Sequence, residues 1–122
     1  MFKKSLASLA LLAIAGASHA SSDYPNRSIH MIIPLAAGSA VDVAARLIMQ
    51  RAAEHIGQPI VIENVPGASG AIGAQRVAQA TPDGYTIGGF NDSILAMVPH
   101  LMKGLKWDPM KSFEHVTVAA TV

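Results

Sequence analysis

Three short segments of small and polar residues could bind an anion, and each directly follows a predicted strand. They are residues 35–40, 65–71 and 91–93, and the first two lead into predicted helices. The first turn of a helix has unpaired N–H groups and a partial positive charge, so it can hold a carboxylate or a phosphate without a cationic side chain. The candidate ligand-binding residues are Gly38, Ser39, Ala40, Asp42, Ser69, Gly70, Ala71, Asn91 and Ser93.

The same segments also allow a purely structural interpretation. Gly38 and Gly70 could approach a ligand or could only form tight turns, and the sequence leaves both alternatives open. Gly73 lies one turn into its helix, where a glycine indicates close packing. Asp42 could form a capping box with Ser39. Alternatively, it could face the site, where it would repel a bare anion and favour an amine or a bridging water.

Other chemistries lack their motifs. The first loop contains one glycine, Gly38, instead of the G-x-G-x-x-G of a dinucleotide site, and a Walker lysine is absent, so we expect no cofactor. Ser69 follows Gly67 at the spacing of a nucleophile elbow, but Ala71 replaces the second glycine. The chain has no cysteine, and its histidines show no metal-ligand spacing. We therefore expect neither a catalytic nor a metal site, and an exported hydrolase-type α/β enzyme remains the alternative.

Hydrophobic patterns alternate between strand and helix along the chain. Short β-branched runs between turns predict strands, and apolar residues three and four positions apart predict helices. The predicted strands are 28–34, 60–63, 85–90 and 113–122, and the predicted helices are 38–57, 71–80 and 94–105, the last broken or kinked at Pro99. This order predicts an α/β fold with a parallel, doubly wound sheet, whose carboxyl edge would carry the three loops.

The first predicted helix is amphipathic, and such a helix buries its apolar face. Ser39 and Gly57 fit its N-terminal and C-terminal caps. The apolar face comprises Val41, Ala44, Ala45, Ile48, Ala52 and Ile56. The polar face comprises Asp42, Arg46, Gln50 and Glu54.

The first twenty residues have the three parts of a secretory signal peptide. Two lysines precede an apolar run from Leu6 to about Ala17, and small residues at Ser18 and Ala20 suit a signal peptidase. The run is too short to span a bilayer, which takes about 20 apolar residues. We expect cleavage after Ala20. The remaining residues 21–122 are near neutral in charge, so we expect no nucleic-acid partner.

Three stretches of the chain carry motifs whose order and spacing are specific. They are "YPNRSIHMIIPLAAGSAVDVAARL", "GQPIVIENVPGASGAIGAQRVAQATPDGYTI" and "PHLMKGLKWDPMKSFEHVTVAA", which lie between Tyr24 and Ala120. They resemble the periplasmic solute-binding proteins of tripartite tricarboxylate transporters, the Bug-type receptors. The resemblance implies a two-lobed flytrap fold in which backbone amides, hydroxyls and ordered waters hold a small carboxylate. It also implies that the ligand is presented to the membrane permease subunits of the transporter.

The chain departs from the family pattern in its loops and in its length. Leu35 stands where the family usually has an aromatic residue, and Ser39 and Ser69 stand where glycine is common. The identity of the carboxylate therefore stays open. Family members continue into a second lobe and then return to complete the first. We therefore expect residues 21–122 to be part of the first lobe, as a fragment, a truncated gene product or a non-functional remnant, and to bind carboxylates weakly or not at all when alone.

Overall fold

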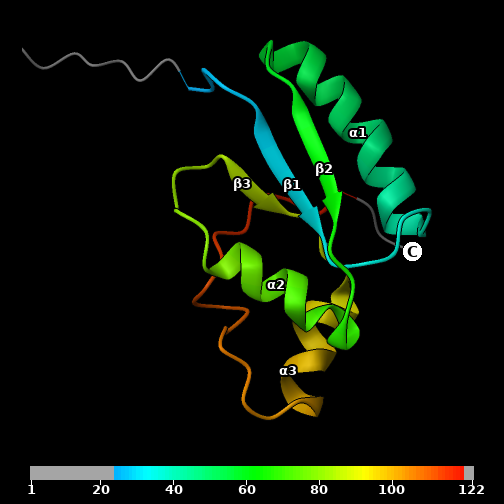
Figure 1. Ribbon diagram of the computed structural model, residues 1–122, viewed down its shortest axis with the longest axis vertical. Coiled ribbons are helices and arrows are strands. Elements are labelled where there is room, and N and C mark those ends of the chain that lie inside the picture. Colours follow the sequence, from blue (N-terminus) through cyan, green and yellow to red (C-terminus); the bar gives the residue numbers. More distant parts are fainter. Residues whose placement is uncertain (1–23, 120–122) are drawn as a thin grey trace, which may run out of the picture.

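The computed structural model describes residues 24–119, which form a three-stranded parallel sheet with helices around it (Figure 1). The predicted signal peptide, residues 1–20, lies outside the described residues. Along the chain the elements are β1 (Ile29–Ile33), α1 (Ala40–Ile56), β2 (Ile60–Asn64), a 3-10 helix (Ala68–Gly70), α2 (Ala71–Ala78), β3 (Thr86–Gly88), a π-helix (Ser93–Met97) and α3 (Val98–Leu101). Within residues 24–119, none of the helices is both long and apolar enough to cross a bilayer.

The sheet has β1 at its centre, in the order β2-β1-β3. Both neighbours run parallel to β1, with Ile29 opposite Ile60 and His30 opposite Thr86. Parallel neighbours need a crossover connection, and α1 and α2 supply the two crossovers. The structure thus confirms the predicted α/β fold, the parallel sheet and the first three predicted strands, although the strand ends differ slightly from the prediction.

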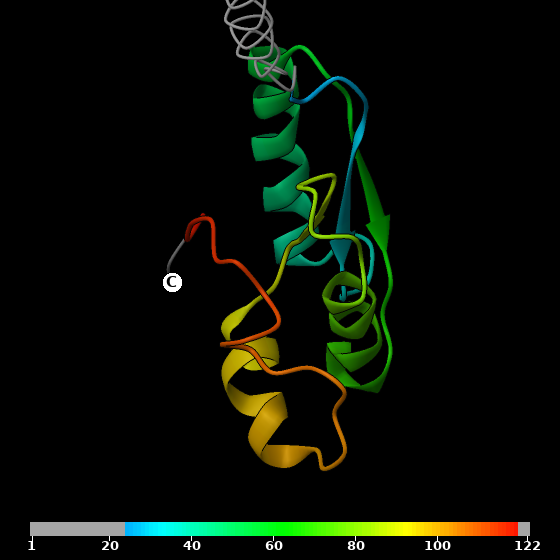
Figure 2. The same cartoon turned by 90° about the vertical axis from the view of Figure 1, so that its left-hand side faces the viewer.

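α1 covers one face of the sheet and α2 covers the other (Figure 2). Side chains alternate between the two faces of a strand, and Met31 and Ile33 pack with Ala45 of α1. Ile32 points to the opposite face, where it lies near Ile72 of α2. Met31, Ile32 and Ile33 are each at most 6% exposed, so this half of β1 is buried on both faces, whereas His30 is exposed.

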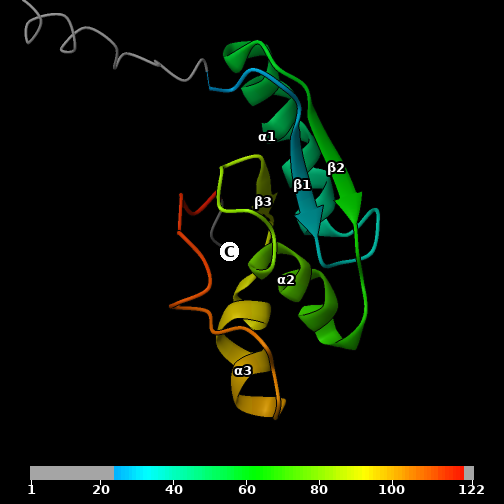
Figure 3. The same ribbon diagram turned by 60° about the vertical axis from the view of Figure 1, so that its left-hand side comes forward.

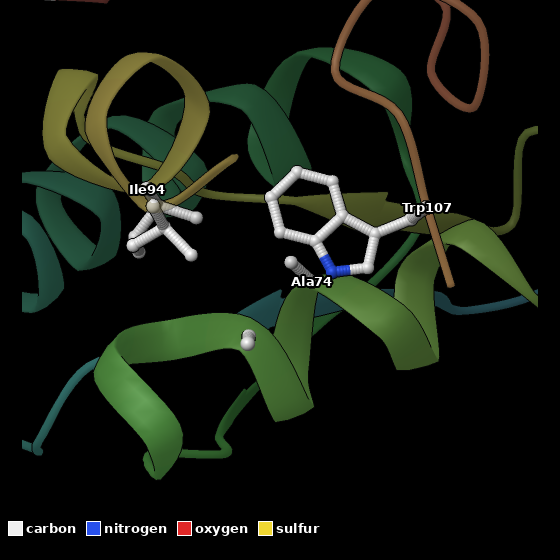
Figure 4. Close-up of a cluster of buried hydrophobic side chains, with 5 residues drawn as sticks. Ala74, Ile94 and Trp107 are labelled. Atoms are coloured by element: carbon white, nitrogen blue, oxygen red, sulfur yellow. The ribbon is translucent and has the colours of Figure 1, made fainter. Parts of the chain in front are cut away.

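A second buried cluster lies between α2 and the chain that follows β3 (Figure 4). Ala74 of α2 packs with Ile94 of the π-helix and with Trp107, which follows α3. In Figure 4 the two larger side chains both point toward α2. Phe113 packs edge-on against Trp107, with the ring centroids 5.7 Å apart. The cluster therefore holds residues 93–113 against α2.

α1 has the predicted caps, but its buried face differs from the prediction. Ser39 Oγ accepts a hydrogen bond from Asp42 N at 3.3 Å, and Gly57 ends the helix in the left-handed conformation. Asp42, predicted on the polar face, is 2% exposed, whereas Ile48, predicted on the apolar face, is 39% exposed. The prediction for Asp42 was wrong because groups outside the helix form hydrogen bonds to its buried carboxylate. Helical periodicity carries no information about such partners.

The predicted fourth strand is wrong for the residues that the structure describes. Of the predicted span 113–122, residues 113–119 form no strand. The side chains of Val116 and Val118 are 88% and 76% exposed. A strand needs a neighbour for its backbone N–H and C=O groups, and the sequence pattern does not say whether one is present.

The helix predicted over 94–105, with a break or kink at Pro99, has no break at that residue and ends at Leu101. Residues 93–97 form a π-helix in which Val98 N donates to Ser93 O, and α3 then runs to Leu101. Pro99 stands near the start of α3 but follows the π-helix directly, so it has no N–H to donate to a carbonyl of that preceding turn. A similar correction applies to residues 68–70, which were predicted as loop and form a short 3-10 helix.

Candidate functional site

The three predicted loops follow strands whose carboxyl ends form one edge of the sheet (Figure 3). Hydrogen bonds tie each of the first two loops to the end of the neighbouring strand at this edge. Val65 N donates to Ile33 O at 2.8 Å, and Asn64 Nδ2 donates to Leu35 O at 3.1 Å. The third loop reaches the second through the π-helix, because Ile94 packs against Gly70. The structure therefore brings the three loops together, as expected for a parallel sheet.

Asp42 is bonded through both of its carboxylate oxygens. Oδ2 accepts from Gly38 N at 2.8 Å and from Arg46 Nε at 3.1 Å, while Oδ1 lies 3.0 Å from Asn64 Nδ2 and 3.0 Å from Arg46 Nη2. The hydrogen bond from Arg46, followed by those from Gly38 and Asn64, lowers the pKa of Asp42 to about 2. Asp42 is therefore ionised at neutral pH, and its charge is balanced by Arg46.

The amides of the first loop differ in their partners. Gly38 N donates to Asp42, and Ser39 N donates to Ala36 O at 3.2 Å. Ser39 Oγ accepts the capping bond, which leaves the hydroxyl hydrogen as a donor. Ala40 begins α1, so its N–H belongs to the first turn, which has no intrahelical acceptor. The Ser39 hydroxyl and the Ala40 amide are thus better placed to donate to an anion than the Gly38 amide.

The second loop has an uncommon backbone conformation. Gly67, Ala68, Ser69 and Gly70 all have positive φ angles, although two of them carry a β-carbon. Gly70 N donates to Gly67 O at 2.9 Å, and Ala71 N donates to Ala68 O. Two of the predicted amide donors are therefore engaged within the loop itself. The hydroxyl of Ser69 remains a candidate donor because a hydroxyl can rotate to suit its partner.

Packing accounts for two glycines of this region. A β-carbon at position 73 would lie 2.7 Å from Pro34 Cβ and 2.8 Å from Val65 O, which confirms the predicted packing role of Gly73. A β-carbon at position 70 would lie 2.6 Å from Ile94 Cδ1. Gly70, for which the sequence left both alternatives open, therefore has a packing role whether or not it also approaches a ligand.

The third loop starts the π-helix with side-chain caps. Asn91 Oδ1 accepts from Ile94 N at 3.2 Å, and Asp92 Oδ1 accepts from Ser93 N at 2.9 Å. The Asn91 carboxamide thus uses its oxygen within the protein and keeps its NH₂ group as a donor. The hydroxyl of Ser93 is a second candidate donor in this loop.

The sequence prediction missed Arg46 and Asn64 as parts of the site. Arg46 Nη2 donates to Asn64 Oδ1 at 2.9 Å, and both side chains bind Asp42. The i,i+4 spacing of Asp42 and Arg46 is a sequence signal for their ion pair. Asn64 offers no comparable signal, because its contact with Asp42 depends on how the end of β2 lies beside the start of α1.

The chemistry available at the carboxyl edge is hydrogen-bond donation by hydroxyl and amide groups. In the part of the chain that the structure describes, no group of three or more Asp, Glu or His side chains is placed to hold a metal ion. Two open hollows of about 600 Å³ each lie elsewhere, one beside the Glu63–Arg76 ion pair and one between Tyr24 and Tyr85. None of the predicted site residues lines either hollow.

Comparison with known proteins finds one matching family model and several curated relatives. The model of the tripartite tricarboxylate transporter family receptor matches residues 44–122. A UPF0065 protein of Bordetella bronchiseptica is 41% identical over 106 residues, which make up 87% of this chain and 32% of that protein. The chain spans about a third of the length of the curated relatives it matches.

Several solved structures are also similar to this chain. A periplasmic transporter is 46% identical with a TM-score of 0.71, over 72% of this chain and 30% of that chain. An R. palustris protein solved with adipate is 37% identical with a TM-score of 0.68, over 71% and 29% of the two chains. MatC of Rhodopseudomonas palustris, solved with bound malate, is 37% identical with a TM-score of 0.63, over 74% and 31%. Because the family model matches more than half of its residues, the chain belongs to the tripartite tricarboxylate transporter receptor family, whose members are transporter receptors and not enzymes.

Proposed function

We propose that this chain supplies part of the ligand site of a periplasmic receptor that captures a small carboxylate for a tripartite tricarboxylate-type transporter. One observation carries the proposal. Loops with hydroxyl and amide donors meet at the carboxyl edge of a parallel sheet, in a chain whose relatives include proteins solved with adipate and with malate. Ligands of open α/β sheets bind beyond this edge.

The carboxylate would be held by neutral donors. We assign this role to the hydroxyls of Ser39, Ser69 and Ser93, the NH₂ group of Asn91 and the N–H of Ala40. Asp42 does not oppose the ligand's charge, because Arg46 balances its carboxylate. Hydrogen bonds of this kind compete with water, so the gain in binding free energy is small unless a second wall covers the ligand. We therefore propose that residues 21–122 form one wall of the site and bind weakly without the other.

Binding is tested by titrating the ¹⁵N-labelled chain, purified after export, with adipate and malate. We expect weak, saturable shifts of the amide signals of Ser39, Ser69 and Ser93, with a Kd of about 1 mM or higher, which corresponds to roughly −4 kcal/mol or weaker. The diamide of adipic acid is the matched control, since it keeps the length and lacks the charge. Equal shifts with the diamide, no shift with either acid, or shifts confined to the region of Glu63 and Arg76 would contradict the proposed site.

Export and delivery are separate parts of the proposal. The pattern of residues 1–20 and a relative described as a periplasmic transporter support export, with cleavage after Ala20. Delivery to membrane permease subunits is supported by the family assignment. Mass spectrometry of the exported chain should find Ser21 as the first residue. An intact Met1 terminus in the membrane fraction would contradict the cleavage.

A further inference from the structure

We infer that Asp42 and Asn64 are positioning residues, which fix the first loop to the end of β2 and thereby set the distance between the first two loops. The role of these residues in ligand binding rests on the proposed function, because the two loops belong to the proposed carboxylate site. The hydrogen bonds that Asp42 and Asn64 form between the first loop and β2 belong to the folded chain, so they can be tested without a ligand.

The bonds of Asp42 connect three separate parts of the chain. Its carboxylate binds Gly38 in the first loop, Arg46 one turn further along α1, and Asn64 at the end of β2. The side chain is nine-tenths or more buried, and a buried carboxylate is costly unless it is paired and hydrogen-bonded. The burial of Asp42 is therefore conditional on all of these partners staying in place.

Asn64 continues the connection into the second loop. Its NH₂ group donates to Leu35 O in the first loop and to Asp42 Oδ1, while its Oδ1 accepts from Arg46. The next residue, Val65, donates its N–H to Ile33 O at the end of β1. The carboxamide of Asn64 thus ties the start of the second loop to the backbone of the first.

Helix capping alone does not explain this arrangement. Ser39 already supplies the N-terminal cap by accepting from Asp42 N. The bonds from Asp42 to Gly38 and Asn64 are additional to that cap. Gly38 has a φ of +81°, and no heavy atom lies within 4 Å of the position that its β-carbon would occupy. The hydrogen bonds from Gly38 N to Asp42 and from Ser39 N to Ala36 O therefore hold this loop, and only the first depends on Asp42.

The first experiment measures amide exchange and chemical shifts by NMR in the full chain. In Asp42→Asn and in Asn64→Ala, exchange at Gly38 should accelerate at least ten-fold relative to exchange at Met49 in the middle of α1. Ala45→Gly is the matched control, because it weakens the same helix and leaves the network intact. Acid titration adds a direct test of the contact between Asp42 and the Gly38 amide. The Gly38 amide signal should shift with a midpoint near the pKa of Asp42, about 2, and this shift should vanish in Asp42→Asn.

The second experiment repeats the adipate and malate titrations with the three variants. Asp42→Asn and Asn64→Ala should each weaken binding at least ten-fold, and Ala45→Gly should retain it. If the unsubstituted chain binds neither acid, the proposed weak binding by this wall fails, and the exchange data still decide whether the loop is positioned by this network. Unchanged protection of Gly38 in both network variants would overturn the inference. So would affinities that fall equally in the control and in the network variants.

Discussion

Gly70 and Ile94 are packed so closely that no side chain fits between them. A β-carbon at position 70 would lie 2.6 Å from Ile94 Cδ1, and the backbone of Gly70 has a φ of +90°. Both the space and the backbone conformation therefore require glycine. The contact joins the second loop to the π-helix, so the relative placement of two candidate ligand loops depends on it.

Substitution of Gly70 should destabilise the fold strongly. We expect Gly70→Ala to lower the free energy of unfolding by roughly 2–5 kcal/mol, which combines overpacking of about 1–3 kcal/mol with a left-handed backbone cost of about 1–2 kcal/mol. Gly38→Ala is the control, because Gly38 also has a positive φ but faces open space, so it should cost only the backbone part. Urea denaturation measures both. Equal losses in the two variants would contradict the packing argument.

The same contact can be tested from its other side. If Ile94 is the obstacle, Ile94→Ala should relieve part of the cost of Gly70→Ala, and the double variant should be more stable than the sum of the two single losses predicts. Ile94→Ala alone should cost about 2–5 kcal/mol, because Ile94 is 2% exposed in the second cluster. Simple additivity would show that the two positions do not interact.

Asp42 should make the stability of the chain depend on acid pH. Its folded-state pKa of about 2 lies below the ordinary value of 3.8, so the unfolded chain binds more protons between these values. The stabilising contribution is therefore complete above about pH 3.8 and is lost as the pH falls through 2. Urea unfolding at a series of pH values should show this decline in the unsubstituted chain and a flatter profile in Asp42→Asn. Parallel profiles would mean that another group is responsible.

Trp107 should stabilise the second cluster, and its fluorescence should follow the unfolding of that cluster. It is the single tryptophan of the sequence and is 6% exposed, and its Nε1 has no hydrogen-bond partner among the described residues. Trp107→Ala should cost about 3–5 kcal/mol through the cavity it leaves. Trp107→Phe should cost clearly less, because it keeps a ring and removes an unpaired buried N–H worth about 1–3 kcal/mol. Intrinsic fluorescence should shift to longer wavelength on unfolding, and equal losses in the two variants would argue against the unpaired N–H.

The segment after the second cluster should promote self-association. Val116 and Val118 are among the most exposed apolar side chains, and they belong to a β-branched run that forms no strand in residues 113–119. Exposed apolar segments of this kind pair readily with other chains. Replacing both valines with lysine should raise the monomer fraction in sedimentation velocity. Leu47→Lys on α1 is the control for added charge, and an equal effect there would assign association to charge alone.

The sequence predicted the regular part of the fold because its signals are local. β1, β2 and β3 are short β-branched runs between turns, α1 and α2 have helical periodicity, and Ser39 and Gly57 cap α1 as predicted. The burial of Asp42 and the missing fourth strand were both mispredicted because they depend on distant partners. Asp42 is buried because Asn64 reaches it from β2. Residues 113–119 have a strand pattern, but a ladder requires a neighbouring strand as well.

The candidate site was likewise predictable in its local features and not in its contacts. Residue types at the strand ends identified the loops, and the parallel sheet then required the loops to share an edge. Which groups are free to donate could not be derived from the sequence. The amide of Gly38 is used by Asp42 of α1 and that of Gly70 within its own loop, and both glycines have left-handed backbone angles.

The central position of β1 has a consequence for the order in which the chain can fold. β1 is synthesised before both of its partners, β2 and β3, with Ile60 opposite Ile29 and Thr86 opposite His30. Parallel, non-local pairing of this kind forms slowly, since the intervening loops must close first. Until then an apolar strand remains without a ladder, and exposed segments of this type aggregate. While the chain is still emerging, β1 is therefore the segment that a chaperone would have to protect.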